Sequence, residues 1–351
     1  MAYAGAVTFS SVPGVPRVVV VGGGIAGACV AFFASRLGWR VTVVDAGRGR
    51  ASDVPAALLN PVRGQSGQVD ARALAGLQAS WALVRTLESL GQVVPCGQTG
   101  VLRPVPSDAA RVKFERNLPP ELPHRWLEAG EGPVLPDGWP HRLLVPEGGW
   151  VSGPGLLAAL RGASGASVVR GVVSGWDARS VTLADGSVVR ADRVVWCGGS
   201  LGALPQVGQG VGARHRRGSV LLLDRAVFPL PVSSGVYLSP AVGGGVLGAT
   251  FETPTGAFGE GGPPLQSLHW LLSRAAALAP DLSAGVRGVW SGSRLSGEAC
   301  GERPDGTWAL TGLGSKGFLL GPLLAQALVD GLQASLGWPS GPGVGASSPG
   351  R

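Results

Sequence analysis

The chain has 351 residues, of which 45% are apolar and 15% are charged, without blocks of like charge. This length supports a large hydrophobic core and predicts about two domains. The composition excludes intrinsic disorder except at the Gly-, Pro- and Ser-rich end, where residues 338–351 are expected to form a flexible tail. Four scattered cysteines and four scattered histidines, with no C-x-x-C pair, argue against a disulfide framework and a zinc site, so no metal is expected.

The formal net charge of +7 would suit an anionic partner such as RNA. Only Lys113 and Lys316 are lysines, and the many arginines occur together with much Ala, Gly and Pro, which also indicates genomic compositional bias. The first 16 residues lack the basic start and long apolar stretch of a secretory signal, which predicts a cytoplasmic protein. The uncharged run Val18–Ser35 has the length of a short membrane span, but its glycines favour a buried strand, turn and helix, so no membrane association is expected.

The segment Arg17–Asp45 has the pattern of a strand, a glycine turn, a helix and a second strand. In such a unit Gly22 permits the tight turn, Gly24 lets the backbone approach a pyrophosphate, and Gly27 lets the helix pack closely on the strand. The helix N-terminus then faces the phosphates, and the carboxylate of Asp45 can accept hydrogen bonds from the adenosine ribose. Because the strand, helix and acidic end flank the glycines at the expected spacing, the pattern predicts a dinucleotide site rather than an unliganded α/β unit.

NAD and FAD both bind to this kind of unit, and two features favour FAD. The unit lies near the N-terminus, and a second strand-like run, Ala191–Ser200, returns more than a hundred residues later and contains glycines at its end. In flavoproteins such a strand rejoins the same sheet and passes beside the dinucleotide. The preceding residues, Ser180–Arg190, predict a hairpin with an Asp-Gly turn.

Further segments match one family in the same order along the chain: Ala51–Pro61, Gly148–Pro154, Arg217–Val220, Tyr237–Pro240 and Val246–Glu252. They resemble the superfamily of D-amino-acid oxidase and glycine oxidase, in which the first of these segments crosses the flavin. The resemblance covers most of the chain. It is closest to the flavin domain of the bacterial bifunctional enzymes that make 5-methylaminomethyl-2-thiouridine in tRNA.

A last match, Gly312–Ala327, resembles a Gly-x-Gly-Ser-Arg-Gly loop that opens a helix whose N-terminal amides face the flavin in this family. A helix dipole and free backbone donors there would stabilise the reduced, anionic isoalloxazine. The chain departs from the family at two places. Lys316 stands where Arg is more common in the family, and an ammonium binds a carboxylate only as a point charge. Asp53–Val54 stand where Gly-Asn is usual. The methyltransferase half of the bifunctional enzymes has no counterpart in this sequence, so a role on tRNA would require a separate partner.

The resemblance also implies the reaction, in which the substrate carboxylate is held while hydride passes from the carbon that bears nitrogen to the flavin. Arg294 resembles the arginine of the carboxylate clamp, and the alternative is a surface or ion-paired arginine. Lys316 could contact the substrate carboxylate or the flavin, or could cap its own loop. Tyr237 could line the substrate face or serve packing alone. Cys300 lies near the region of covalent flavin attachment in sarcosine oxidases, but we expect an ordinary loop cysteine.

We therefore predict an α/β protein with a Rossmann-like FAD-binding domain and a second, mainly antiparallel β (α+β) substrate domain. The FAD-binding domain would be discontinuous and comprise residues 1–75, 145–205 and 285–337. The substrate domain would comprise residues 76–144 and 206–284. It would contain most of a helix at Leu74–Leu90 and strands around Val220 and Val246.

The predicted site has two groups of residues. Arg294 and Lys316 are the predicted catalytic residues. The predicted cofactor-binding residues are Gly22, Gly24, Ile25, Ala26, Gly27, Asp45, Ala51, Ser52, Gly198, Gly314, Ser315, Gly317 and Phe318.

Three functions are consistent with these patterns. The leading one is an FAD-dependent oxidoreductase that oxidises the C–N bond of an amine or N-substituted glycine, either free or attached as carboxymethylaminomethyl to the wobble uridine of tRNA. The second is a free D-amino-acid or glycine oxidase. The third, of another class, is a non-catalytic flavin-binding protein that kept the fold. The expected partners are a small amine or amino-acid substrate, or tRNA.

Overall fold

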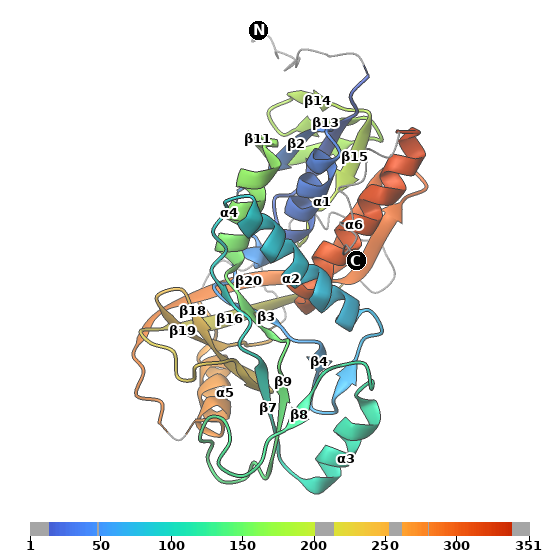
Figure 1. The fold of residues 1–351 in the computed structure, drawn as a ribbon. Helices are drawn as coiled ribbons and strands as arrows, with labels where there is room; N and C mark the ends of the chain where they lie inside the picture. Colours follow the sequence, from blue (N-terminus) through green and yellow to red (C-terminus); the bar gives the residue numbers. More distant parts are fainter. Residues whose placement is uncertain (1–13, 48, 201–213, 253–261, 280, 339–351) are drawn as a thin grey trace, which may run out of the picture.

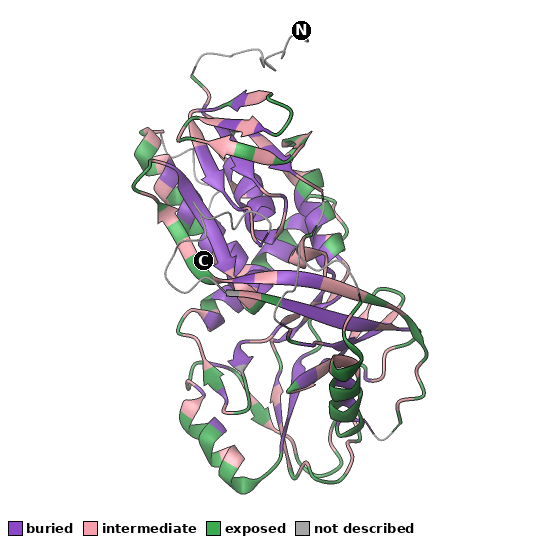
Figure 2. Ribbon diagram, turned by 180° about the vertical axis from the view of Figure 1, so that it is seen from behind, coloured by how far each residue is buried: buried purple, intermediate pink, exposed green. Residues whose placement is uncertain are grey.

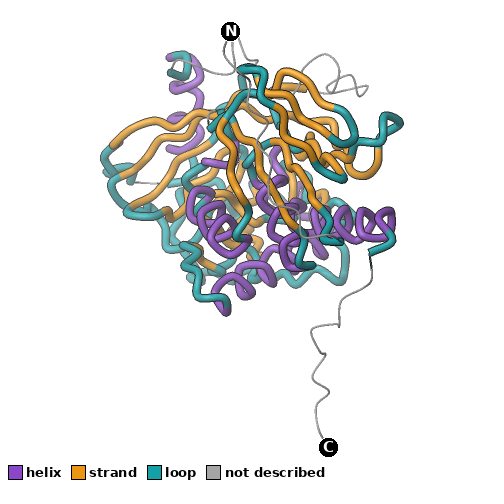
Figure 3. Tube along the Cα trace, turned by 90° about the horizontal axis from the view of Figure 1, so that it is seen from above, coloured by secondary structure: helices purple, strands orange, loops and turns teal. Residues whose placement is uncertain are grey.

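The computed structural model of the protein describes residues 14–47, 49–200, 214–252, 262–279 and 281–338. Within these residues one mixed sheet of 13 strands forms the centre, and most helices lie on one side of it (Figures 1 and 3). In spatial order the strands are β11 (Ser167–Arg170), β2 (Arg40–Asp45), β1 (Arg17–Val21), β15 (Arg193–Trp196), β21 (Trp308–Leu313), β20 (Val286–Glu302), β16 (Arg214–Leu223), β19 (Gly244–Gly248), β18 (Val236–Ala241), β17 (Val232–Ser234), β7 (Val101–Val105), β9 (His141–Val145) and β8 (Arg125–Trp126). The predicted tail lies outside the described residues from 339 onward.

The five strands from β11 to β21 are parallel. β1 pairs with β2 on one side and with β15 on the other, and α1 (Ile25–Arg36) connects β1 to β2. The predicted strand–turn–helix–strand unit is therefore confirmed, and so is the return of the strand within Ala191–Ser200 to the same sheet. All four valines of Val18–Val21 are buried, which is typical of a parallel strand that is covered on both faces.

The two faces of β1 bury different partners. Val18 and Val20 share a core with Phe32 of α1, and Val19 shares a second core with Val181. On the helix side, α1 packs against α4 (Gly153–Ser164) and α6 (Gly317–Leu336), and α6 packs against α2 (Ala73–Ser89). The second core includes residues of a small antiparallel sheet of β12 (Val173–Trp176), β13 (Ser180–Leu183) and β14 (Val188–Arg190). This sheet contains the predicted Asp-Gly hairpin.

Helix α6 is the one described helix with the length and composition of a membrane span, counted with its preceding turn as Gly314–Leu336. Half of this stretch is buried inside the protein, where α6 packs against α1 and α2. It is thus a core helix of this fold. The earlier apolar run, Val18–Ser35, forms β1, the glycine turn and most of α1, as predicted.

From β20 onward most strand pairs are antiparallel. The 17-residue strand β20 pairs with β16 along its first part and with β21 along its last part, so it joins the two halves of the sheet (Figure 1). α5 (Leu265–Ala276) contacts β18 and β19 and buries Leu271 and Ala275, while its outer surface is exposed (Figure 2). The predicted fold class is confirmed. The domain boundaries stay a prediction.

Two smaller expectations have different outcomes. The helix predicted at Leu74–Leu90 is α2. The expectation that Cys300 lies in a loop is wrong, because it lies in β20, where four glycines and a register shift between Ser296 and Ala299 obscure the strand pattern. The remaining elements are short: β3 (Ala57–Leu59), β4 (Val62–Arg63), β5 (Gln68–Val69), β6 (Cys96–Gly97), β10 (Gly149–Val151), α3 (Asp108–Asn117) and the 3-10 turns η1 (Ala51–Asp53) and η2 (Gly314–Lys316).

Candidate active site

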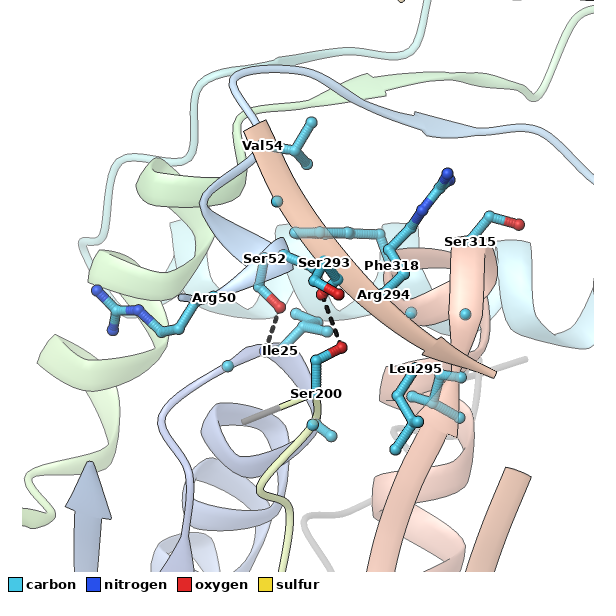
Figure 4. A pocket seen from close by; sticks show the side chains of 18 of the residues that line it. Ile25, Arg50, Ser52, Val54, Ser200, Ser293, Arg294, Leu295, Ser315 and Phe318 are labelled. Carbon is cyan, nitrogen blue, oxygen red and sulfur yellow. Dashed lines mark hydrogen bonds between the residues drawn. The ribbon is translucent and has the colours of Figure 1, made fainter. Parts of the chain in front are cut away.

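A cavity of about 570 Å³ lies where the carboxyl ends of β1, β2 and β15 meet the N-termini of α1 and α6. Its volume is within the range of about 300–1,000 Å³ that is usual for ligand sites. All predicted site residues except Gly27 line it: Gly22, Gly24, Ile25, Ala26, Asp45, Ala51, Ser52, Gly198, Arg294, Gly314, Ser315, Lys316, Gly317 and Phe318. Figure 4 labels five of them, Ile25, Ser52, Arg294, Ser315 and Phe318. The tertiary structure therefore brings together segments from three separate parts of the chain.

The glycine turn after β1 forms one wall of this cavity. Gly22 has a φ of +101°, in the region that favours glycine, and its amide donates to the carbonyl of Val44 at 2.8 Å. Gly27 lies one helical turn further on, where a Cβ would overlap the carbonyl oxygen of Gly22. Gly27 is thus a packing residue beneath the turn, as its predicted role of close helix–strand packing requires, and not part of the cavity wall.

The N-terminus of α1 faces the cavity and is partly capped from a distant segment. Gly24 is the N-cap residue and has no side chain, so Ser52 of η1 takes its place: the Ile25 amide donates to Ser52 Oγ at 3.0 Å (Figure 4). The N-cap residue itself provides no side-chain cap for the other amides of the first turn. Such a helix end is a favourable site for a phosphate group.

Asp45 ends β2 beside this turn and is buried with 9% exposure. Its Oδ2 accepts from Arg50 Nη1 at 3.1 Å, and Arg50 Nε donates to Asp53 Oδ2 at 3.0 Å. Arg50 therefore links β2 to η1 and also lines the cavity. Sequence reasoning missed Arg50. The one available signal was its position between two acidic residues, five after Asp45 and three before Asp53.

The N-terminus of α6 forms the opposite end of the site. The turn η2 leads directly into the helix at Gly317, and the N-cap Lys316 provides no side-chain cap for the first amides. Ser315, Gly317 and Phe318 line the cavity at this end. Free backbone donors and the positive end of the helix dipole thus lie at the cavity, and their contact with the flavin stays a prediction.

Lys316 does not stand alone at this helix end, because its ammonium forms an ion pair with Asp70 Oδ2. The hydrogen bond from Lys316 holds the pKa of Asp70 well below its usual range. Asp70 Oδ1 also accepts from the Arg72 amide at 3.0 Å, and Arg72 donates to both carboxylate oxygens of Glu298 at 2.7 and 3.0 Å. No sequence pattern indicates this network, because the pairs Lys316–Asp70 and Arg72–Glu298 each join residues more than 200 positions apart.

Arg294 lies on β20 and reaches the cavity near Tyr237 and Phe251. Its guanidinium carbon is 5.0 Å from the centre of the Phe251 ring. Burial lowers the pKa of Arg294, and the nearby phenol of Tyr237 opposes this shift. Among the described residues no carboxylate forms an ion pair with Arg294. Burial raises the pKa of Tyr237 to about 12, so this phenol is neutral at physiological pH, and it donates to the carbonyl of Ala56 at 3.4 Å.

Two buried hydroxyls in the cavity wall test whether a polar ligand fits. Ser293 Oγ and Thr311 Oγ1 are buried and have no hydrogen-bond partner within the described part of the chain, and both residues line the cavity. Buried polar groups in native proteins normally have partners, so these hydroxyls fit a polar ligand that donates or accepts there. Nearby, Ser200 donates to the carbonyl of Ser293 at 2.9 Å, which ties the loop after β15 to β20 (Figure 4). The cavity suits FAD, because one of the two helix ends at it would favour a phosphate group and the lining offers free polar groups.

Comparison with known proteins gives the class to which this fold and site belong. The family model described as FAD dependent oxidoreductase, DAO, matches residues 17–331, so the chain belongs to this family of oxidoreductases, which use FAD and act on CH–NH groups. The predicted superfamily, cofactor and enzyme class are therefore confirmed. In the part of the chain that the structure describes, no cluster of three or more His, Cys, Asp or Glu residues could hold a metal ion.

Among relatives, the tRNA 5-methylaminomethyl-2-thiouridine biosynthesis bifunctional protein MnmC of Caulobacter sp. (strain K31) is 29% identical over 337 residues, which is 91% of this chain and 55% of that protein. The corresponding protein of Caulobacter vibrioides is 31% identical over 335 residues, which is 88% of this chain and 53% of that protein. The chain thus spans about half the length of these relatives.

Two solved structures share the fold over nearly their whole length. Glycine oxidase from Geobacillus kaustophilus has a TM-score of 0.78 and 25% identity, and the match covers 91% of this chain and 95% of that one. Iminodiacetate oxidase from Chelativorans sp. BNC1 has a TM-score of 0.76 and 25% identity, with 95% and 99% covered.

Proposed function

We propose that the protein oxidises the C–N bond of an N-substituted glycine, with Arg294 binding the substrate carboxylate. The observation that carries this proposal is the placement of Arg294 in the cavity wall, half-buried and with no carboxylate partner among the described residues. A guanidinium that is partly removed from water and has no counter-ion raises the free energy of the folded protein. A substrate carboxylate would supply the missing partner through two parallel hydrogen bonds.

The surrounding residues suit this role. Phe251 lies beside the guanidinium and Tyr237 stays neutral, so neither competes with the substrate carboxylate for Arg294. The α6 N-terminus, with Ser315 and Phe318, lies at the same end of the cavity and presents its positive dipole there. Bound FAD supplies the acceptor for the hydride that leaves the carbon bearing nitrogen. We assign no general base, because an amine that binds in its neutral form can lose hydride without one.

We further propose that the glycine nitrogen is attached to the wobble uridine of tRNA as a carboxymethylaminomethyl group. The similarity to MnmC proteins over about nine-tenths of the chain and the net charge of +7 support a nucleic-acid substrate. The proposal covers the C–N bond oxidation alone, because the chain spans only about half the length of those proteins. The alternative is a free glycine or D-amino-acid oxidase, which the similarity to the glycine oxidase fold supports.

Anaerobic reduction of the flavin tests these alternatives. The purified holoenzyme is mixed in parallel with glycine, sarcosine, D-amino acids and tRNA that carries carboxymethylaminomethyluridine, and bleaching of the yellow absorbance is recorded. Bleaching by the modified tRNA but not by unmodified tRNA would support the tRNA substrate. Bleaching by a small amine alone would favour the metabolic oxidase. Bound FAD that none of these compounds reduces would contradict an oxidase of N-substituted glycines and favour a non-catalytic flavoprotein.

A further inference from the structure

The cations that line the cavity differ in what balances their charge. Among the described residues the lining contains three, Arg50, Arg294 and Lys316. Arg50 is paired with Asp45 and Asp53 at the end of the cavity where the glycine turn lies. Its side chain points away from Arg294 (Figure 4). At the other end Arg294 lies close to Ser315, which directly precedes Lys316 at the start of α6 (Figure 4). The charges of Arg294 and Lys316 would act together on a substrate unless one of them were compensated.

Lys316 is compensated by a network that reaches well beyond the cavity. Its ammonium pairs with Asp70, which also accepts from Arg72, and Arg72 holds Glu298 with two hydrogen bonds. The side chains of Lys316 and Asp70 are only 15% and 21% exposed, so solvent screens this pair less than a surface ion pair. Two cations and two anions give the network a net charge of zero (2 − 2 = 0).

We propose that Asp70 determines the charge of the substrate that this site accepts. By holding and neutralising the Lys316 ammonium, Asp70 leaves Arg294 as the one uncompensated cation among the described residues at this end of the cavity. The site then favours N-substituted glycines that carry a single carboxylate over substrates with two carboxylates. Asp70 is a positioning residue, since it acts through Lys316, and the inference rests on the proposed binding of a substrate carboxylate by Arg294.

The test uses two substrate analogues in which sulfur replaces the nitrogen, so that they bind without being oxidised. Methylthioacetate carries one carboxylate and thiodiacetate carries two. Their affinities for the oxidised holoenzyme are measured from the change in flavin absorbance, and the ratio of the two dissociation constants gives the charge preference. This ratio reports on charge, which a general loss of packing would not change selectively.

Asp70→Asn keeps an oxygen that can accept from the Arg72 amide but removes the negative charge. The network then carries +1, and we expect the affinity for thiodiacetate to rise about two- to twentyfold relative to methylthioacetate. This range is what one added unit charge would cause if it acted over a distance on the order of 10 Å at dielectric constants from about 80 to 20. Lys316→Met leaves the network at −1, so the ratio should move in the opposite direction while methylthioacetate binding changes less than about fivefold.

The double variant Asp70→Asn/Lys316→Met restores a neutral network and should return the ratio to within about twofold of the wild-type value. An unchanged ratio in Asp70→Asn, or a shift that persists in the double variant, would overturn the inference. A large loss of methylthioacetate binding in Lys316→Met would also overturn the inference, because Lys316 would then be a direct carboxylate ligand. The Lys316→Met variant therefore tests the role of Lys316 even if Asp70→Asn does not fold. Binding of neither analogue to the wild-type holoenzyme would overturn the proposed function as well.

Discussion

Replacing Arg294 by Met distinguishes a role of Arg294 in substrate binding from a purely structural role. If the guanidinium holds a substrate carboxylate with two charge-assisted hydrogen bonds, each contributes at least about 1.5 kcal/mol, or about 3 kcal/mol together. At about 1.4 kcal/mol per tenfold, the affinity for methylthioacetate and kcat/KM for the substrate should both fall about 150-fold or more. These losses require a ligand that contacts Arg294 directly.

The stability of the same variant should change little. Arg294 has no carboxylate partner among the described residues, so its removal leaves no unpaired anion there. The lost contact with the Phe251 ring is worth about 0.5–1 kcal/mol, and removal of a half-buried charge offsets part of it. A change of about 1 kcal/mol shifts Tm by about 2–4 °C or less in a protein of this size.

The assay combines titration of the flavin absorbance with thermal unfolding of the holoenzyme. Arg287→Met is the matched control, because Arg287 lies on the same strand, is exposed and donates only to the carbonyl of Gly243 among described groups, at 2.7 Å. It should leave ligand binding unchanged. A variant at Arg294 that binds methylthioacetate normally while its Tm falls by about 6 °C or more would refute the assignment and make Arg294 a structural residue.

Other substitutions probe the cofactor end and the buried phenol. Gly27→Val should prevent FAD binding, because the new side chain would overlap the Gly22 carbonyl. The flavin-to-protein absorbance ratio of the purified variant measures the bound FAD. A normal ratio would contradict the close packing described for α1. Arg50→Ala removes the partner of the Asp45 carboxylate, and we expect the affinity for FAD to fall about tenfold. Fluorescence titration of the apoprotein measures this affinity. An unchanged affinity would show that Arg50 has no role in cofactor binding. Burial raises the pKa of Tyr237 to about 12, above the ordinary value of about 10, so its contribution to stability is complete below pH 10 and is lost as the pH rises towards 12. Tyr237→Phe should therefore weaken the fall of Tm between pH 10 and 12, and an identical fall in both proteins would argue against a raised pKa.

The sequence alone determined the parts of this protein that depend on short-range patterns. The unit Arg17–Asp45 is predictable because the turn, the close packing at Gly27 and the buried valines each place a strict demand on a neighbouring residue type. The same holds for the turn before α6, where Gly-x-Gly-Ser-Lys-Gly marks a helix start that faces the cavity. Such local demands remain visible in one chain without any knowledge of its tertiary contacts.

Only the tertiary structure decided how the charged residues are paired. Lys316 and Asp70 are 246 positions apart, and Arg72 and Glu298 are 226 apart, so no spacing in the sequence connects them. With 29 basic and 22 acidic residues in the chain, many pairings are chemically equivalent until the strands and helices place particular side chains together. The sequence favoured Arg294 for the carboxylate and left the role of Lys316 open. The structure distinguishes them, because Lys316 has a counter-ion and, among the described residues, Arg294 has none.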